Sequence, residues 1–376
     1  MGIELDAILY KNLNMKKKIL FIVGARPNII KLAPLFKVFD KKKYNCKILH
    51  TNQHNNLFLY TNIFLDLGVK KPDFLLERKN FANNTNMIAY FISKIGDFIN
   101  CFKPDLVIVF GDVDTTLAAS IAAIKKLVKI IHIEAGLRSP IFFAQEEINR
   151  RIVDKISWIN FTTTKIAQKN LKKENLNKNS FYVGNIIFDN YFNLKKKILR
   201  KQILRKLNLQ KNNYILITIH RYQTIDNKQN LKGFLQFLDT ISKKYKIIFS
   251  VHTRTLKNIQ KFQFQDYLRN KNIIVSNPFK FTDFASLLIN SKLVITDSGG
   301  VQEEAKFHSK KTIVFRDINE REDLIDNITS IRSNNKNLLK NFNKIINLKN
   351  KIKNSKYKLV SNKIYKIIEQ KLNLNK

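Results

Sequence analysis

Several residue types are scarce in this chain of 376 residues, and each shortage argues against a class of protein. The 2 cysteines lack metal-ligand or CxxC spacing, and the 6 histidines lack clustered acidic or cysteine partners, so we expect neither a disulfide framework nor a metal site. No apolar run approaches the roughly 18 to 20 residues that cross a bilayer, so no membrane span is expected. No GxGxxG motif follows the first apolar strand, so a nicotinamide cofactor is not indicated, and we expect no cofactor.

Acidic residues are also few, because 29 Asp and Glu stand against 68 Lys and Arg, a formal net charge of +39. Such a charge favours binding to polyanions through counterion release. The lysines, however, are spread along the whole chain among Asn and Ile, and they do not gather in one stripe with aromatic residues between them. We interpret the charge as compositional drift. It predicts adsorption to polyanions at low salt and no specific nucleic-acid partner.

The first 14 residues contain Glu4 and Asp6 and no sustained apolar core, which argues against a secretory signal. Met15, followed by three lysines and a strand, offers a second plausible start, so residues 1–14 are interpreted as an N-terminal extension. The two cysteines suit a reducing compartment, and a cytoplasmic location is the simplest expectation.

What the chain does contain is a repeated unit of apolar strand, short polar loop and helix. Uninterrupted apolar strands are what a parallel sheet covered on both faces requires. The length exceeds what one core usually supports, so we expect two α/β domains, the first ending near residue 187. The expected strands are 19–23, 47–50, 106–110, 130–133, 159–163 and 181–183 in the first half, and 214–219, 246–251, 272–275, 293–295 and 312–315 in the second.

Charged side chains follow the strands of the first half. Arg26, Asp112 and Glu134 each come directly after a predicted strand, and His220 takes the same position in the second half. Parallel strands end at one edge of a sheet, where open α/β folds bind ligands, so the first three are expected on one rim. A single acid there is commonly a helix cap, and Asp112 before Thr115 fits that alternative. Two acids on one rim favour a site.

A strand at 293–295 leads through a polar turn with two adjacent glycines into a helix. Such a turn directs unpaired backbone N–H groups and the positive end of the helix dipole at one point, which attracts phosphate. Gly299 and Gly300 would admit a diphosphate without a Cβ in the way, Ser298 offers a hydroxyl, and Glu304 is placed to accept hydrogen bonds from sugar hydroxyls. The alternative is an ordinary Gly-Gly turn before an acidic helix start.

The segment 145–156 has the spacing of an amphipathic helix. Ile148, Ile152 and a third isoleucine at 156 are expected on its buried face. Glu146, Asn149 and Arg150 share another face, either as part of a site or as a solvent-exposed ion pair.

Taken together and in order, the motifs resemble those of the bacterial non-hydrolysing UDP-N-acetylglucosamine 2-epimerases, from about residue 15 to residue 327. The motifs that carry the resemblance are GARP at 24–27, KLAPL at 31–35, TNQH at 51–54, GD at 111–112, TT at 115–116, HIEAGLR at 132–138, EEINR at 146–150, GN at 184–185, HR at 220–221, TDSGGVQEE at 296–304, RD at 316–317 and ER at 320–321.

This resemblance implies a GT-B-like α/β fold, with two Rossmann-like domains whose parallel sheets face each other across a cleft. Its domains would be residues 15–187, carrying the acid/base residues, and 188–360, binding UDP, with a C-terminal helix at 361–376 that packs back on the first domain. The family is usually homodimeric. Its members convert UDP-GlcNAc reversibly to UDP-ManNAc, for surface polysaccharide synthesis, through loss of UDP and a 2-acetamidoglucal intermediate.

The resemblance also assigns roles to individual residues. Asp112, Glu134 and Glu146 become the acid/base candidates, with the side of C2 that each faces left open. The departing diphosphate would meet Arg26 and His220, supported by Lys31 and Arg150. The residues expected to hold UDP are Ser298, Gly299, Gly300 and Glu304, with Phe281 near the uracil.

Departures from the family pattern leave the substrate open. Asn28 stands where an acid is usual, Val113 where Thr is common, and the segment between Arg138 and Glu146 is one residue short. The alternatives are an epimerase of another UDP-N-acetyl sugar, such as UDP-2,3-diacetamido-glucuronate, and a hydrolysing epimerase that releases ManNAc and UDP. A GT-B glycosyltransferase and a polyanion-binding protein are the readings from other classes.

Overall fold

The computed structural model describes residues 16–39, 43–53, 57–77, 79–139, 142–200, 202–317, 324–348 and 357–373, with backbone only at 57–61. The chain forms two compact units. The N-terminal unit comprises residues 1–193 with 358–376, and the C-terminal unit comprises residues 194–357. The chain passes from the first unit to the second between residues 193 and 194, a few residues after the domain boundary that we expect near residue 187.

The N-terminal unit is built on a seven-stranded parallel sheet of order β3-β2-β1-β4-β5-β6-β7. Its strands are β1 (Lys17–Val23), β2 (Tyr44–His50), β3 (Phe74–Leu75), β4 (Leu106–Phe110), β5 (Lys129–Ala135), β6 (Ile159–Thr162) and β7 (Ser180–Tyr182). The central strand β4 is buried along its whole length, because both faces of the sheet are covered.

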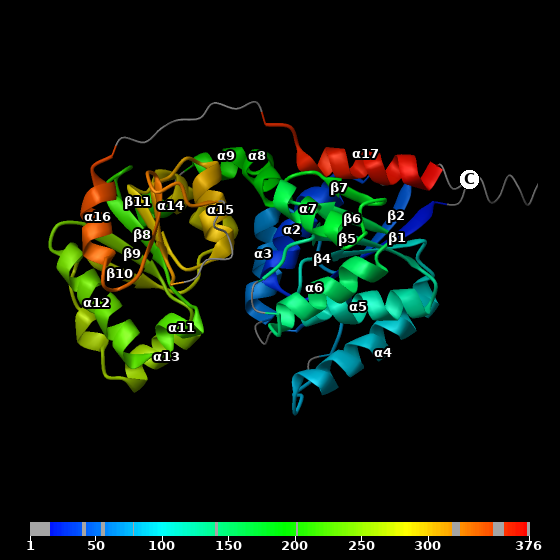
Figure 1. Cartoon of the computed structure of the whole chain (residues 1–376), viewed down its shortest axis with the longest axis horizontal. Helices are drawn as coiled ribbons and strands as arrows, with labels where there is room; N and C mark the ends of the chain where they lie inside the picture. Colours follow the sequence, from blue (N-terminus) through cyan, green and yellow to red (C-terminus); the bar gives the residue numbers. More distant parts are fainter. Residues whose placement is uncertain are drawn as a thin grey trace, which may run out of the picture. The chain divides into compact units, whose positions relative to one another are not determined.

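Helices form a layer on each face of this sheet (Figure 1). The helices are α2 (Arg26–Val38), α3 (Leu57–Leu67), α4 (Asn84–Phe102), α5 (Asp114–Lys125), α6 (Gln145–Ile156), α7 (Lys165–Lys173), η1 (Ile186–Phe188), α8 (Asp189–Asn193) and α17 (Val360–Asn373). Leu20 and Ile22 of β1 pack toward α4 and α5, whereas the ring of Phe21 between them contacts Phe36 of α2. Successive side chains of β1 therefore point to opposite faces of the sheet and pack into two different cores.

The C-terminal helix α17 packs against α2 within the N-terminal unit. The carboxylate of Asp189 accepts hydrogen bonds from the backbone N–H groups of Val360 at 3.0 Å and Ser361 at 2.7 Å. These are the first residues of α17, so Asp189 satisfies donors that the helix leaves unpaired and fixes where it begins.

The C-terminal unit repeats the architecture with a six-stranded parallel sheet of order β10-β9-β8-β11-β12-β13. Its strands are β8 (Tyr214–Thr218), β9 (Lys246–Ser250), β10 (Ile273–Ser276), β11 (Leu293–Thr296), β12 (Thr312–Phe315) and β13 (Ser330–Ser333). Its helices are α9 (Lys195–Leu199), α10 (Gln202–Lys206), α11 (Tyr222–Ile225), α12 (Lys228–Ser242), α13 (Thr253–Lys261), η2 (Gln265–Leu268), α14 (Phe281–Asn290), α15 (Gly299–Phe307) and α16 (Leu338–Ile346).

Alternate residues of β8 again serve two cores. Ile215 and Ile217 belong to the cluster that includes α12 and α16, whereas Tyr214 and Leu216 belong to the cluster that includes α10 and α14. The predicted α/β class, with a parallel sheet in each of two domains, is confirmed. In both sheets the strand order reverses beside the first strand, and the strand ends at such a switch point are where ligands bind in this class of fold.

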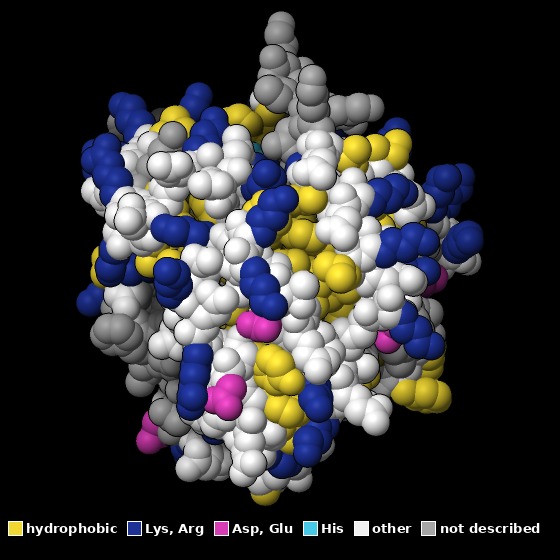
Figure 2. All heavy atoms as spheres, turned by 90° about the vertical axis from the view of Figure 1, so that its left-hand side faces the viewer, with side chains coloured by type: hydrophobic (Ala, Val, Ile, Leu, Met, Phe, Trp, Pro, Cys, Tyr) yellow, Lys and Arg dark blue, Asp and Glu magenta, His cyan; other side chains and the backbone are white. Residues whose placement is uncertain are grey.

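Basic side chains are dispersed over the surface seen in Figure 2, with few acidic side chains among them. No helix in the described ranges is both long and apolar enough to cross a membrane. In the same parts of the chain, no three His, Cys, Asp or Glu side chains are grouped so that they could hold a metal ion.

Candidate active site

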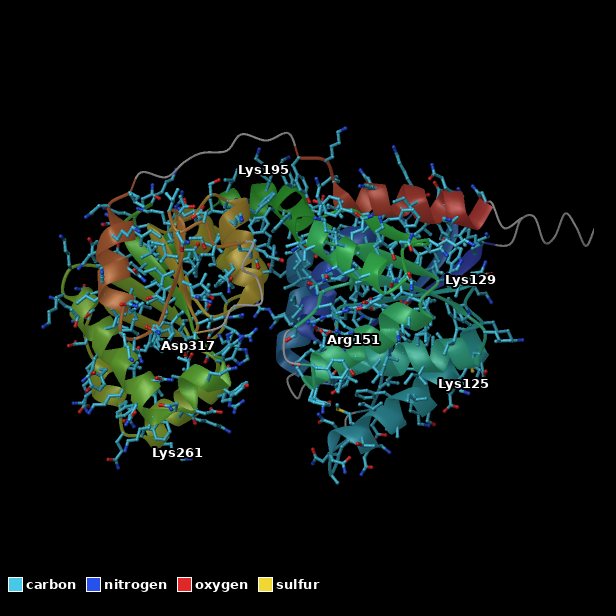
Figure 3. All side chains as sticks on the ribbon, viewed as in Figure 1. Lys125, Lys129, Arg151, Lys195, Lys261 and Asp317 are labelled. Carbon is cyan, nitrogen blue, oxygen red and sulfur yellow. The ribbon has the colours of Figure 1, made fainter. Side chains whose placement is uncertain are left out.

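The N-terminal half of the candidate site lies where β4 and β5 end. In Figure 3, Lys129, at the start of β5, is labelled toward the right of the N-terminal unit, and Arg151, on α6, is labelled to the left of it. Gly111 follows β4 with a φ of +67°, which suits glycine, and Glu134 near the end of β5 has a φ of 76°. A non-glycine residue in that conformation is uncommon and marks a backbone held by its surroundings.

Gly111 brings the two predicted acids into one small region. A Cβ built on Gly111 would lie 3.2 Å from Nζ of Lys31 and 3.3 Å from Oε2 of Glu134. The carboxylate of Glu134 therefore lies against the residue that directly precedes Asp112. Lys31 also forms an ion pair with Glu134, with 8% of the Lys31 side chain and 13% of the Glu134 side chain exposed.

Asp112 pairs with a different cation. Its carboxylate forms an ion pair with Arg150 of α6, and its backbone carbonyl accepts a hydrogen bond from Asn149 Nδ2 at 2.9 Å. The alternative of a helix cap is wrong, because the N-cap of α5 is Val113, without a side-chain cap hydrogen bond. The motif at 146–150 thus holds Asp112 from two sides.

The predicted orientation of α6 is wrong for two of its three isoleucines. Ile148 and Ile152 are 37% and 38% exposed, whereas the isoleucine at 156 packs against the core. The buried residues of the helix are Glu147, Asn149, Val153 and Asp154. Glu147 is fully buried and lies 3.1 Å from Nη1 of Arg150, so charged contacts, together with Val153 in the core, decide which face of α6 is covered. Glu146, the third acid/base candidate, lies exposed in the first turn of α6.

Arg26 is the first residue of α2 and is half-buried. The turn before it is fixed by Asn28, whose Oδ1 accepts hydrogen bonds from the N–H groups of Gly24 at 3.3 Å and Ala25 at 3.1 Å. Asn28 Nδ2 in turn donates to the carbonyl of Phe110, at the end of β4, at 2.7 Å. The asparagine that departs from the family pattern therefore connects the loop of Arg26 to the loop of Asp112.

The C-terminal half contains the predicted strand–turn–helix. Ser298 is the N-cap of α15 with an extended backbone, and its side chain makes no capping hydrogen bond. Among the residues that the structure describes, a Cβ built on Gly300 would have no neighbour within 4 Å, and one on Gly299 would meet only Nη2 of Arg316, at 3.9 Å. The two glycines therefore leave room beside the positive end of the helix, where an anion is favoured. Glu304 lies half-buried further along α15.

Asp297 connects this turn to His220. Oδ2 of the fully buried Asp297 accepts hydrogen bonds from the backbone N–H groups of His220 and Arg221, both at 2.8 Å. Nδ1 of His220 lies 3.0 Å from Oδ1 of Asp297, within ion-pair distance. The side chain of His220 remains 41% exposed, so one buried carboxylate positions an accessible imidazole beside the turn.

Phe281 begins α14, and only 3% of it is exposed, so its ring belongs mainly to the packing of the C-terminal unit.

A cavity of about 480 Å³ is lined by residues at the ends of β12 and β13 and by residues of α11. Its charged lining residues include Arg221, Arg316, Lys336 and Asp317, the last labelled in Figure 3. The volume is within the range of small-ligand pockets. His54 and the ER motif at 320–321 lie outside the described residues.

A family model for UDP-N-acetylglucosamine 2-epimerases matches residues 37–368. The chain belongs to this epimerase family. A UDP-N-acetylglucosamine 2-epimerase of Methanocaldococcus jannaschii is 36% identical over 349 residues, which cover 90% of this chain and 94% of the relative. A UDP-2,3-diacetamido-2,3-dideoxy-D-glucuronate 2-epimerase of Pseudomonas aeruginosa is 33% identical over 313 residues, covering 82% of this chain and 86% of the relative.

Among solved structures, the M. jannaschii UDP-GlcNAc 2-epimerase in complex with UDP-GlcNAc and UDP is similar to this chain with a TM-score of 0.84 and 33% identity. That similarity covers 94% of this chain and 99% of the other. The chain is therefore an enzyme of the UDP-GlcNAc 2-epimerase family, as its motifs predict. The roles of its individual residues stay predictions.

Two residues of the candidate active site, Glu147 and Asp297, were not predicted individually from the sequence. Glu147 is an equal neighbour of Glu146 in the EEINR motif, and only the fold decides which of the two is buried. Asp297 stands between β11 and the glycine turn. An acidic residue directly after an apolar strand is the same sequence signal that identified Asp112, so Asp297 could have been found in this way.

Proposed function

We propose that this enzyme interconverts UDP-GlcNAc and UDP-ManNAc without net hydrolysis. One carboxylate removes the proton from C2 while the C1–O bond to UDP breaks, which leaves a C1=C2 double bond in a 2-acetamidoglucal. UDP then adds back to C1 through the same oxygen, and an acid returns a proton to the opposite face of C2. No water is consumed and no redox partner is needed.

The observation that carries the proposal is the juxtaposition of Asp112 and Glu134, each beside its own cation. Proton removal from a weakly acidic C2 and proton return to its other face need two groups that act on one carbon. A glycosyltransferase would use the phosphate turn but would not need this second carboxylate. Substitutions of Asp112, Glu134 and Glu146 test which acid acts as the base and whether Glu146 takes part.

In the C-terminal unit, we assign the diphosphate to the start of α15. Ser298, Gly299 and Gly300 offer a hydroxyl and backbone N–H groups, and His220 offers a proton or positive charge to the leaving oxygen. Glu304 is assigned to the ribose and Phe281 to the vicinity of the uracil. Arg26 and Lys31, with Arg150, are assigned to supply further positive charge to the departing diphosphate.

Deuterated water provides the direct test. With UDP-GlcNAc, the proposal expects deuterium at C2, UDP-ManNAc as a product, and no accumulation of free ManNAc. Free ManNAc with UDP would instead identify a hydrolysing epimerase. No C2 exchange on any UDP-N-acetylhexosamine would reject the epimerase reaction.

Two variants test the assigned residues. Asp112→Asn and Glu134→Gln should each slow C2 exchange by about 1,000-fold, within the range for loss of an acid or base group, while UDP binding persists. Asp97→Asn is the matched control, because Asp97 is an exposed carboxylate on α4 that forms an ion pair with Lys94. Undiminished exchange in Asp112→Asn would remove Asp112 from the mechanism, and a Glu146→Gln variant decides the place of the third acid in the same assay.

The P. aeruginosa relative motivates a second candidate substrate, UDP-2,3-diacetamido-2,3-dideoxy-D-glucuronate. Residues 252–255, which read His-Thr-Arg-Thr, resemble the corresponding stretch of relatives that act on other UDP-N-acetyl sugars, and this resemblance favours the second candidate. Its sugar carries a carboxylate that UDP-GlcNAc lacks, so it needs an additional cation. The ratio of kcat/KM for the two substrates decides between them.

We also propose a cytoplasmic homodimer, which the family resemblance implies. The exposed apolar side chains on and just before α6 support a contact there, namely Phe142 at 55%, Phe143 at 83%, Ile148 at 37% and Ile152 at 38% exposure. Light scattering should give twice the chain mass, and Ile148→Glu/Ile152→Glu should give the monomer. A monomeric wild type would reject the dimer.

A further inference from the structure

His132 is buried in β5 between two acceptors. Its ring is fully shielded from solvent, with Nδ1 2.8 Å from Oδ1 of Asp154 and Nε2 2.8 Å from the backbone carbonyl oxygen of Gly111. A carbonyl oxygen accepts hydrogen bonds and never donates one, so Nε2 must carry a hydrogen. The state of Nδ1 then depends on Asp154.

Asp154 has the environment of an ionised carboxylate. Its other oxygen, Oδ2, accepts hydrogen bonds from the N–H of Gly136 at 3.0 Å and from Nη1 of Arg138 at 2.8 Å. Burial raises the pKa of Asp154, but the hydrogen bonds that its carboxylate accepts and the charge of Arg138 outweigh it and hold the pKa below its usual value. With Asp154 acting only as an acceptor, Nδ1 carries a hydrogen as well.

Acidic side chains outnumber the arginines around His132. In the described part of the chain, ion pairs connect His132, Arg138, Arg150 and Arg151 with Asp154, Glu174, Glu147 and Asp112. A further carboxylate, the 8% exposed Asp114, lies beside this network through its hydrogen bond from Asn149. This excess of carboxylates favours a positive charge on the ring of His132.

The network begins and ends at the same turn. From His132 the contacts pass through Asp154, Arg138, Glu147 and Arg150 to the carboxylate of Asp112. At its other end, His132 holds the carbonyl of Gly111, the residue directly before Asp112. The turn is therefore held from both sides, through its backbone and through its acidic side chain.

We propose that both ring nitrogens of His132 carry a hydrogen, one donated to Asp154 and one to the Gly111 carbonyl, and that His132 acts as a positioning residue for Asp112. Its two N–H groups join Asp154 to the Gly111 carbonyl, and so fix the peptide that carries the proposed acid/base group. A displacement of about 1 Å in a reacting group can lower a rate by about 100-fold, so this hold matters for turnover. The kinetic consequence rests on the epimerase reaction proposed above, but the protonation state does not.

Nitrogen-15 NMR of histidine-labelled wild-type protein tests the charge directly. At pH 7.5, where a free imidazole is mostly neutral, both ring nitrogens of His132 should show the protonated shift. His308 is the internal control, because burial, together with the Lys310 charge, lowers its pKa to about 4, so its ring should be neutral at pH 7.5. The His132→Gln variant assigns the signal. An unprotonated nitrogen in the His132 ring at this pH would overturn the proposal whatever the activity.

Two substitutions test the positioning role. The side-chain amide of Gln reaches about as far as Nε2 and can still donate to Gly111, whereas that of Asn reaches only about as far as Nδ1. His132→Asn should therefore lower kcat for C2 exchange by about 100-fold, with KM and UDP affinity little changed, and His132→Gln should retain more activity. Wild-type kcat in a folded His132→Asn variant would overturn the role. If wild-type protein shows no exchange at all, the proposed reaction fails and the NMR result alone decides the charge.

Discussion

Lys31 of α2 and Glu134 of β5 form an ion pair in the interior of the N-terminal unit, with only 8% and 13% of their side chains exposed. Removing one partner breaks a largely buried ion pair, and such a loss typically costs about 3 kcal/mol or more. We expect Lys31→Met to lower the free energy of unfolding by about that amount. Lys31→Met/Glu134→Gln should recover part of it, because no lone charge is left. Urea titration followed by circular dichroism measures both.

The control for this pair lies on α4. Lys94→Met removes the partner of Asp97 from a pair whose side chains are 49% and 66% exposed, and it should change stability by less than about 1 kcal/mol. If the Lys31 single and double variants were equally unstable, the loss would come from packing of the lysine stem, and the buried ion pair would not explain it.

Gly300 and Gly96 allow a matched test of the phosphate turn. Both are helical glycines at which a built Cβ meets no atom of the described residues within 4 Å. Alanine at either position should therefore fold without a clash. In the middle of α4, Gly96→Ala should stabilise the protein by about 0.5 to 1 kcal/mol, and it should leave UDP affinity unchanged.

Gly300→Ala should instead weaken UDP binding by about tenfold, or 1.4 kcal/mol, because its methyl group would stand where the diphosphate approaches the backbone. Calorimetric titration with UDP and thermal denaturation of both variants give the two readouts. Unchanged UDP affinity in Gly300→Ala would place the nucleotide elsewhere in the C-terminal unit.

Much of the fold was predictable because its central strands are short apolar runs between polar turns. The sequence features of β4, β8 and β11 are unambiguous, since each is buried on both faces. The edge elements were missed. Strand β3 has two residues and β13 reads Ser-Ile-Arg-Ser, so neither has an apolar pattern, and only pairing with a neighbouring strand defines them.

The site was predictable in its strand-end residues and not in the helix that supports them. Position after a strand is a local property, so Asp112, Glu134 and His220 could be identified. The rotation of α6 could not, because its isoleucines predict one buried face and its ion pairs select another. Glu147 is buried by contacts with Arg150 and Arg151, whose partners come from other parts of the fold.

The two cysteines should differ sharply in reactivity. Burial raises the pKa of the half-buried Cys46 to about 12, with the Lys70 charge opposing the rise and the Asp73 charge adding to it, whereas Cys101 is exposed. The thiolate is the reactive form, so iodoacetamide at pH 8 should modify Cys101 and spare Cys46. Intact mass should show one adduct on wild type and none on folded Cys101→Ser. Rapid modification of the Cys101→Ser variant would contradict the shielding of Cys46.

His308, at the end of α15, should make the stability of the C-terminal unit depend on pH in mildly acidic solution. Burial, and secondarily the charge of Lys310, lowers its pKa to about 4, against about 6.5 in an unfolded chain. The folded state therefore binds fewer protons than the unfolded state between these values. The contribution of His308 is fully present above pH 6.5 and is lost as the pH falls toward 4, by up to about 1.4 kcal/mol per pH unit.

Urea titrations at pH 6.5, 5.75 and 5.0 measure this slope above the range where most carboxylates titrate. His308→Asn should flatten it, because asparagine takes up no proton in either state. His252→Asn is the control, since His252 is exposed in the same unit and its replacement should leave the slope unchanged. Equal slopes in wild type and His308→Asn would mean that other groups carry the acid sensitivity, and that the His308 ring is more accessible to protons than its burial implies.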